Sequence, residues 1–221
     1  MKQLLIILTT LAAIAQEALA QVQYDISGTA PEEVRYVLLS DIASQQVIDT
    51  CLIRKGTFRF SGVLAENTFV NLTDDQKGYD VSVIVDATPT VVNLGDNTVN
   101  GSELNMKFND YYKQLVRLQT DVISDYNQFQ QIENDTTQTE ELKRLKRAIS
   151  LKLENITAVE KGIVDANMGN VISAFFLRDL SQDLTYDELL GYLNEHYIFR
   201  NNPILAPAFS RLNKLERNKE N

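Results

Sequence analysis

The sequence predicts an α+β protein in which an N-terminal antiparallel β-sheet or small β-sandwich precedes a long antiparallel helical hairpin and short C-terminal helices. Two features of the apolar pattern predict this order. Apolar residues recur at every second position from Val22 to about Leu94, and at every third or fourth position after Gly101. The chain has 221 residues, of which 44% are hydrophobic, so it can bury a core. The expected segments are a signal peptide at residues 1–20, a β domain at residues 21–100 and a helical domain at residues 101–221.

The N-terminus has the pattern of a secretory signal peptide. Lys2 precedes the apolar run Leu4–Ala15, and Ala18-Leu19-Ala20 is a small-x-small cleavage site. The run is shorter than the ~20 residues that a membrane-spanning helix needs. We therefore expect cleavage after Ala20 and a mature chain in a bacterial periplasm or outside the cell, with no membrane span. Gln21 follows the cleavage site in place of Cys, so we expect no lipoprotein anchor.

Short strands separated by turn residues make up the predicted β region. The alternating apolar residues are Val22, Tyr24 and Ile26; Phe58 and Phe60; and Tyr79, Val81, Val83 and Val85. The turn residues are Gly28, Pro31, Lys55-Gly56, Asp74-Asp75, Gly78 and Pro89. Because no helical pattern falls between these strands, we expect them to pair in antiparallel fashion.

Two long amphipathic helices follow. Apolar residues at helical spacing run from Leu104 to Phe129 and from Leu142 to Ile163. The polar segment Asn134–Thr137 separates the helices, and Thr137 or Thr139 is expected to cap the second one. An antiparallel hairpin is the simplest arrangement. Each arm would be ~40 Å long, so we expect the hairpin tip to project.

Three shorter helices complete the predicted fold. Val171–Leu180 is densely apolar and is expected to be buried. Thr185-Tyr186-Asp187-Glu188 is a capping box that opens a helix running to about Tyr197. After a break at Asn202-Pro203, helical spacing resumes over Ile204–Arg217, with Pro207 in its first turn.

The segment Asp96–Asn105 partly matches two functional motifs. Asp96, Thr98, Asn100 and Gly101 resemble the start of a calcium-binding loop, but Lys107 occupies the position of the closing Glu. Ser102 lacks the flanking glycines of a nucleophile elbow. We interpret Ser102 as the N-cap of the first long helix, at the point where the sheet ends.

The sequence identifies no catalytic, cofactor-binding or metal-binding residues, and we expect no cofactor or metal. The formal charge of −9 argues against binding to nucleic acid or an anionic bilayer. The only histidine, His196, is expected at a helix end beside Glu195 and lacks the spaced partners of a metal site. The basic cluster Lys143, Arg144, Lys146 and Arg147 is interpreted as a solvated helix face, with Glu140 supporting Arg144 four residues later.

Cys51 has no second cysteine with which to form a bridge or a redox pair. It is either a small buried apolar residue or a thiol for an intermolecular bond. The aromatic residues of the first long helix are also open to two interpretations, because one side can pack on the protein while the other meets a partner. They are Tyr111, Tyr112, Tyr126 and Phe129.

Three segments carry a resemblance to a known family: Tyr24-Asp25-Ile26-Ser27-Gly28, Lys55-Gly56-Thr57-Phe58-Arg59-Phe60-Ser61-Gly62 and Asn100-Gly101-Ser102-Glu103-Leu104-Asn105. They resemble the uncharacterised N-terminal domain that precedes thioredoxin-like AhpC/TSA domains in many bacterial envelope proteins. Asn201-Asn202-Pro203-Ile204 is similar to the linker before the redox domain of that family. The chain departs from the family because it ends at Asn221 without a C-x-x-C pair, so the resemblance implies no redox activity here.

These observations favour a non-catalytic envelope module that binds or scaffolds another envelope protein. The alternative is an accessory or stand-alone partner of a thioredoxin-like thiol-disulfide oxidoreductase, which would require an exposed Cys51 or an apolar patch on the hairpin. An enzyme whose site is assembled from dispersed residues is a third hypothesis, and a deep pocket lined by paired carboxylates would support it.

Overall fold

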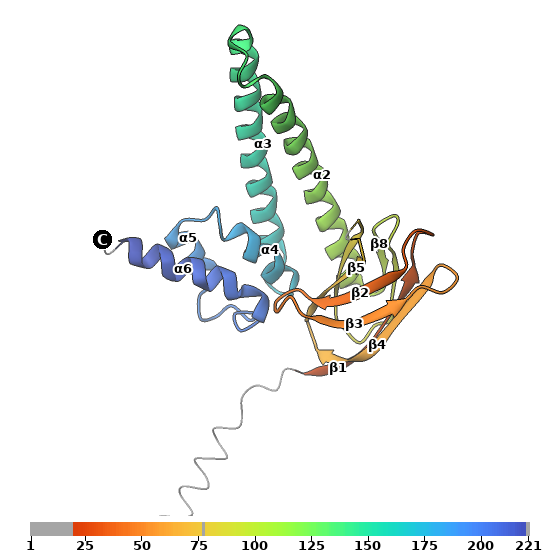
Figure 1. Ribbon diagram of the computed structural model, residues 1–221. Coiled ribbons are helices and arrows are strands. Elements are labelled where there is room, and N and C mark those ends of the chain that lie inside the picture. The colour runs from red at the N-terminus through yellow and green to blue at the C-terminus, as the bar shows by residue number, and fades with distance from the viewer. Residues whose placement is uncertain (1–19, 77, 220–221) are drawn as a thin grey trace, which may run out of the picture. The chain divides into compact units, whose positions relative to one another are not determined.

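The computed structural model describes residues 20–76 and 78–219. The predicted signal peptide, apart from Ala20, lies outside the described residues. The chain divides into two compact units, of which one holds the residues up to Asp41 together with Val47–Ser102. The other holds Ile42–Gln46 together with Glu103 and the residues that follow. All strands of the described residues lie in the first unit, the β unit, and all helices lie in the second, the helical unit (Figure 1).

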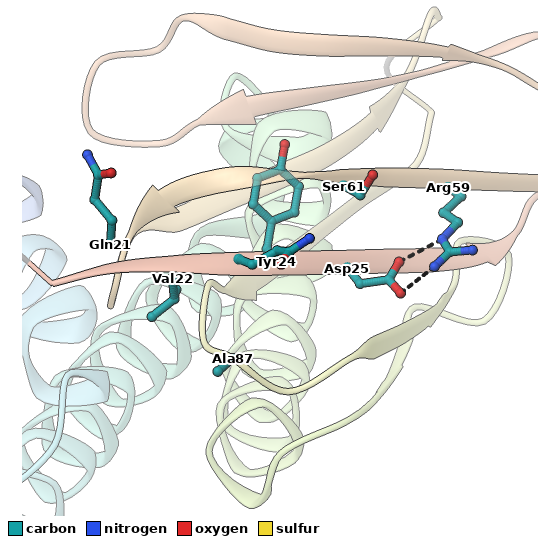
Figure 2. Close-up of a pocket in the computed structure, with 8 residues that line it drawn as sticks. Gln21, Val22, Tyr24, Asp25, Arg59, Ser61 and Ala87 are labelled. Carbon is teal, nitrogen blue, oxygen red and sulfur yellow. Dashed lines mark hydrogen bonds and ion pairs between the residues drawn. The ribbon is translucent and has the colours of Figure 1, made fainter.

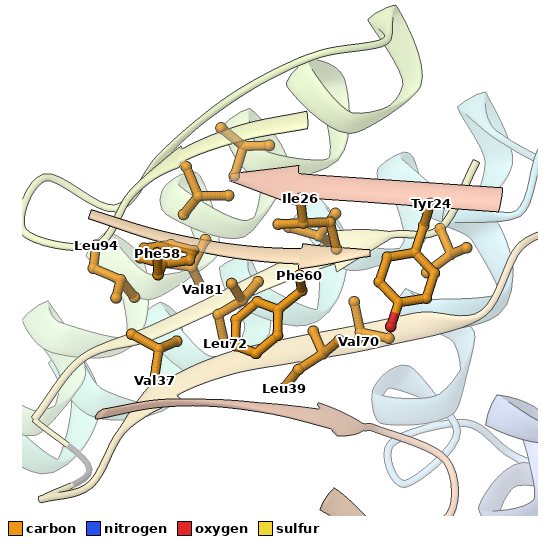
Figure 3. Packing of buried hydrophobic residues seen from close by; sticks show 14 of the residues in the cluster. Tyr24, Ile26, Val37, Leu39, Phe58, Phe60, Val70, Leu72, Val81 and Leu94 are labelled. Carbon is orange, nitrogen blue, oxygen red and sulfur yellow. The ribbon is translucent and has the colours of Figure 1, made fainter. Parts of the chain in front are cut away.

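The β unit consists of two four-stranded sheets, with strand orders β4-β1-β7-β8 and β3-β2-β5-β6. The strands are β1 (Gln21–Thr29), β2 (Tyr36–Asp41), β3 (Val47–Leu52), β4 (Thr57–Ala65), β5 (Phe69–Asp74), β6 (Asp80–Ile84), β7 (Thr90–Asn93) and β8 (Thr98–Asn100). One core cluster joins the sheets: Ile26 and Phe60 come from the first, and Leu39 and Leu72 from the second (Figure 3). Two sheets followed by helices confirm the predicted α+β fold.

One strand pair departs from the expected antiparallel arrangement. β1 and β7 pair in parallel, with Ile26 opposite Thr90, whereas all other paired strands of the described residues are antiparallel. Parallel neighbours need a long crossover connection. Here the chain supplies it without a helix, because it builds the second sheet before it returns to β1 as β7.

The two β segments that carry the family resemblance are adjacent strands. Tyr24 lies opposite Gly62, and Gly28 lies opposite Phe58. A Cβ added at Gly62 would lie 2.9 Å from the Tyr24 hydroxyl oxygen, and one added at Gly28 would lie 2.5 Å from Cζ of Phe58 and 2.1 Å from the carbonyl oxygen of Val92. Each glycine thus leaves room for an aromatic ring, and Gly28 also lets the β7 backbone approach. The two glycines of these segments therefore have a role in packing the β unit.

The helical unit begins with an antiparallel pair of long helices. Lys152 connects them, because its ammonium donates to the carbonyl oxygen of Asp121 at 3.2 Å and pairs with the Asp125 carboxylate at 2.7 Å. No helix of the described residues has both the length and the apolarity needed to cross a bilayer. The elements of the unit are α2 (Glu103–Ile132), η1 (Thr136–Gln138), α3 (Thr139–Ala166), α4 (Ile172–Leu180), α5 (Tyr186–Tyr192), η2 (Pro203–Leu205) and α6 (Ala206–Lys219).

The predicted cap of the second long helix is wrong. Neither threonine caps α3, whose N-cap residue Gln138 makes no side-chain cap hydrogen bond. Instead Asp135 caps the 3-10 turn η1, since its carboxylate accepts from the backbone N–H of Thr137 at 2.9 Å and from the Thr137 hydroxyl at 2.6 Å. The Thr137 hydroxyl is therefore a donor to a stronger acceptor, the ionised carboxylate.

The short C-terminal helices begin where the sequence predicts. Thr185 and Glu188 form the predicted capping box, in which the Thr185 N–H donates to the Glu188 carboxylate at 2.9 Å and the Glu188 N–H donates to the Thr185 hydroxyl at 3.4 Å. The side chain of Asn202 accepts from the N–H of Ile204 at 3.0 Å and caps η2. Pro207 lies in the first turn of α6.

The helix α5 ends earlier than predicted, at Tyr192 in place of about Tyr197. Asn194 turns the chain, because its side-chain amide donates to the carbonyl of Gly191 and accepts from the N–H of His196 at 2.9 Å. His196 therefore lies in the turn after the helix and not at the helix end. Its side chain is 89% exposed, and Nε2 lies 3.8 Å from the carboxylate of the adjacent glutamate.

The aromatic residues of α2 are divided between core and surface. Phe108 is fully buried, and its ring centroid lies 4.8 Å from that of Phe175 on α4 in an edge-on arrangement. Tyr111 and Tyr112 also pack against aromatic rings of α4. Tyr126, further along α2, is 50% exposed. The first turns of α2 thus anchor the helix in the core, whereas Tyr126 is exposed and stacks on the partly buried Phe129.

Candidate functional site

One groove of the β unit has a volume of about 630 Å³. It follows β1 and the face of β4 on which Arg59 and Ser61 lie (Figure 2). Asp25 and Arg59 dominate its chemistry. The carboxylate of Asp25 accepts from Nε of Arg59 at 2.8 Å and from Nη2 at 2.7 Å. We call this the β1–β4 groove; its lining residues are Gln21, Val22, Gln23, Tyr24, Asp25, Arg59, Ser61 and Ala87.

The charges of the β1–β4 groove are already paired with each other. The hydrogen bond from the Arg59 guanidinium lowers the pKa of Asp25, and the carboxylate raises the pKa of Arg59 in return. Both hydrogen bonds join neighbouring strands in a fork geometry that fits a carboxylate. A charged ligand would have to displace this pair. The pair therefore links β1 to β4, and the groove offers no free charge.

The second groove has a volume of about 540 Å³ and lies where β2 begins and β3 ends. We call it the Tyr36–Leu52 groove, after two residues that are direct cross-strand partners. Unlike most apolar residues of the β unit, both are exposed, with fractions of 42% for Tyr36 and 48% for Leu52. Its lining residues are Ala30, Pro31, Glu32, Val34, Arg35, Tyr36, Leu52, Ile53, Lys55 and Gly56.

Two backbone turns hold the Tyr36–Leu52 groove in place. In the first turn, the N–H of Val34 donates to the carbonyl of Pro31 at 3.1 Å. In the second, Arg54 and Thr57 exchange backbone hydrogen bonds of 3.2 Å across the two residues between them. The N–H of Ala30 donates to the carbonyl of Gly56 at 3.0 Å and ties the two segments together. The groove is therefore a pre-formed surface.

Lys55 occupies a backbone conformation that disfavours it. The φ angles of Lys55 and Gly56 are 55° and 73°, so both central residues of the second turn are left-handed, as in a type I′ turn. Asn or Gly is preferred at the first of these positions. A residue with a longer side chain costs about 1 kcal/mol there. The turn places Lys55 in the lining of the groove, and the residue is exposed.

The cations at the Tyr36–Leu52 groove form no salt bridge within the part of the chain that the structure describes. Arg35 and Lys55 line it, and the exposed Arg54 lies in the adjoining turn. Among the residues that the structure describes, none of these three forms a salt bridge with a carboxylate. Glu32 is the carboxylate of the lining. Cations and exposed apolar residues thus lie together in this groove. In the β1–β4 groove, by contrast, the Arg59 cation is paired with Asp25.

Cys51 lies next to Leu52 near the end of β3, which is an edge strand of its sheet. Its exposure is intermediate, and it packs against the core cluster of the β unit. This placement matches a small apolar residue better than a reactive thiol, since reactivity needs exposure and a cationic setting. It does not favour the hypothesis of a disulfide-linked partner.

The segment Asp96–Asn105 is a junction between a strand and a helix. Ser102 immediately precedes α2, and its hydroxyl donates to the Asp86 carboxylate at 2.5 Å. The carboxylate of Asp96 accepts from the side-chain amide of Asn93 at 2.8 Å. Within residues 20–76 and 78–219, no group of three or more His, Cys, Asp or Glu residues is placed to hold a metal ion.

The basic residues of α3 pair differently from the prediction. Arg144 contacts Glu141, three residues earlier, through Nε at 2.7 Å and Nη2 at 2.5 Å. Glu140 pairs instead with Lys143 at 2.8 Å, so its predicted support of Arg144 is wrong. Arg144 binds both carboxylate oxygens of Glu141, and such bidentate pairs are stronger than single hydrogen bonds. All of these side chains are largely exposed, and such pairs contribute little stability.

Glu160 on α3 is a buried carboxyl that the sequence analysis missed. It is 6% exposed. Burial, with smaller contributions from the charges of Asp179 and Asp183, raises its pKa to about 7. The sequence pattern could have indicated this burial, because Glu160 lies at helical spacing between the buried residues Ile156 and Ile163. The raised pKa makes the stability of the folded chain depend on pH.

The comparisons with known proteins identify part of the chain. Residues 24–108 match the family described as a domain of unknown function (DUF4369). This region runs from β1 to the first turns of α2 and ends at Phe108. No curated protein matches the chain. The match confirms the predicted resemblance to an uncharacterised domain and includes the whole Tyr36–Leu52 groove.

Proposed function

We propose that this chain is a non-catalytic, protein-binding module of the bacterial envelope, and that it binds a partner through the Tyr36–Leu52 groove. One observation carries the binding role: Tyr36 and Leu52 are exposed side by side, next to cations that pair with no carboxylate of the described residues. Apolar anchors surrounded by polar groups are typical of binding surfaces. The surface needs no rearrangement, because backbone hydrogen bonds hold it.

The non-catalytic role is supported by how the polar groups of the β unit are used. Asp25 pairs with Arg59, and the carboxylate of Glu33 accepts from the Tyr79 hydroxyl at 2.6 Å. Each of these groups is thus paired within the β unit. A catalytic site would need titratable groups that converge on one reacting atom.

The envelope location is supported by the signal-peptide pattern before Ala20. We expect the protein from the periplasmic or secreted fraction to begin at Gln21 and to carry no lipid. N-terminal sequencing and intact mass measurement test both expectations. A chain that retains Lys2 in the cytoplasmic fraction would overturn the proposed location.

Site-specific photo-crosslinking in cells tests the binding surface. A photoreactive amino acid replaces Leu52, and the matched control places it at Val63, which is 59% exposed on a strand of the other sheet. We expect a discrete adduct from position 52 that Tyr36→Ala greatly reduces, and no such adduct from position 63. Equal adducts at the two positions, or none at position 52, would contradict the proposed surface.

A further inference from the structure

We infer that the Tyr36–Leu52 groove binds an acidic peptide segment that carries one large apolar side chain. This inference rests on the proposed function and adds to it the chemistry of the partner. It follows from the two kinds of group that meet in the groove, which are apolar side chains and cations that form no salt bridge with any described residue.

The apolar part of the groove fits a side chain of a partner. Tyr36 and Leu52 stand opposite each other across β2 and β3, and the other apolar lining residues are Ala30, Pro31, Val34 and Ile53. A volume of about 540 Å³ is within the usual range for ligand sites, and it accommodates a few residues of an extended peptide. One large apolar side chain of such a segment would cover the exposed surfaces of Tyr36 and Leu52.

The charged residues of the groove favour a partner with a negative charge. Arg35 and Lys55 line it, Arg54 adjoins it, and Glu32 is the opposing charge. The whole chain has a net charge of −9, so an excess of cations here is a local feature. Complementary charge mainly governs specificity and association rate. The Arg35 guanidinium has the geometry to bind a carboxylate in bidentate fashion.

Lys55 supplies an independent reason to assign the cations to binding. A type I′ turn is better served by Asn at this position, because Lys pays the cost of the left-handed backbone. An unfavourable local residue that lines a groove and carries a charge is explained when that charge has a ligand. An acidic segment provides one.

The test uses three labelled peptides and the chain from residue 21 onward. The probes are Glu-Asp-Phe-Asp-Glu, its basic counterpart Lys-Lys-Phe-Lys-Lys, and Glu-Asp-Ser-Asp-Glu, which lacks the apolar side chain. Affinity is measured by fluorescence anisotropy, and the site by backbone amide shifts in NMR spectra. We expect the acidic Phe peptide to bind about tenfold more tightly than either of the others. The shifted amides should be those of residues 30–36 and 52–56.

Variants connect the affinity to the named charges. Combining Arg35→Gln with Lys55→Asn should lower the affinity for the acidic Phe peptide by about tenfold. Glu32→Gln should raise that affinity by about threefold. Lys55→Asn suits the turn, so a loss of binding cannot be attributed to loss of fold. Arg117→Gln, which removes an exposed cation on α2, is the matched control and should change nothing.

The outcomes separate this inference from the proposed function. Groove shifts with all three peptides at similar affinity, unchanged by the charge variants, would overturn the acidic partner and leave the groove as a binding surface. Failure of every peptide to shift the groove residues would also overturn the acidic partner. Together with the absence of a crosslink at position 52, that result would overturn the proposed function as well.

Discussion

Replacing Glu160 with Gln should stabilise the helical unit at neutral and alkaline pH, and should change little near pH 4.5. The pKa of Glu160 rises from an ordinary 4.5 to about 7 in the folded chain. The folded state therefore holds this proton more tightly than the unfolded state. The contribution of this proton to the free energy of unfolding is largest below pH 4.5. It falls as the pH rises and reaches its lower limit above pH 7.

The size of the effect follows from the same pair of pKa values. The difference between 4.5 and about 7 is about 2.5 pKa units. At ~1.4 kcal/mol per unit, ionising Glu160 costs up to about 3 kcal/mol of stability. The cause is the removal of a carboxylate from water beside Asp179 and Asp183. The Arg178 cation near them pairs with Asp179 at 2.7 Å. Glutamine remains neutral and avoids this cost.

The assay is urea unfolding between pH 5 and pH 8, with hydrogen exchange of α3 and α4 peptides as a local readout. Local readout is needed because the two units need not unfold together. This window also avoids Glu188, whose pKa is lowered to about 2 by hydrogen bonds from Lys161 and Thr185. The stability that depends on Glu188 is present above its ordinary pKa and is lost only as the pH falls toward 2.

Glu154→Gln is the matched control, because Glu154 is an exposed glutamate on the same helix. The control should keep the wild-type decrease of stability from pH 5 to pH 8, whereas Glu160→Gln should remove most of it. If Glu160→Gln keeps the full decrease, or is less stable than wild type at pH 8, the proposed cost of ionisation is refuted.

Three further substitutions test the packing and the caps by urea unfolding followed by circular dichroism. Gly28→Ala should cost about 3 kcal/mol or prevent folding, because its Cβ would lie 2.1 Å from the Val92 carbonyl oxygen, a backbone atom that cannot move alone. Gly62→Ala should cost only about 1 kcal/mol, since the Cβ would meet the outer end of the Tyr24 side chain at 2.9 Å and that ring can shift; equal losses at the two glycines would argue against this account of the motif. Thr185→Ala removes the capping box and should cost about 1 kcal/mol, with exchange increased in the first turn of α5 and not in α6; an unchanged stability would contradict the cap.

Local patterns were enough to predict most of the elements. The switch of period near Gly101 predicted where the strands give way to α2, and the capping box predicted the start of α5. Both signals act within a few residues, so they are visible in a single sequence. The ends of elements were harder to predict. Asp135 displaced the expected threonine cap, and Asn194 ended α5 early, because competing side chains nearby made better hydrogen bonds.

The candidate site depended on pairing that no local pattern contains. Tyr36 and Leu52 each look like an ordinary apolar strand residue, and only the register of β2 on β3 places them together on an exposed surface. The Arg59 cation belongs to a strand pattern as well, and the structure alone shows that Asp25 neutralises it.

The amino-acid sequence by itself determined the order of the elements, the change from sheet to helix and the family resemblance of the β unit, because backbone preferences and apolar periods are local. Only the tertiary structure decided which described cations form salt bridges, which apolar residues face solvent and that burial raises the pKa of Glu160 to about 7. Those properties depend on burial and on charges that distant segments bring together.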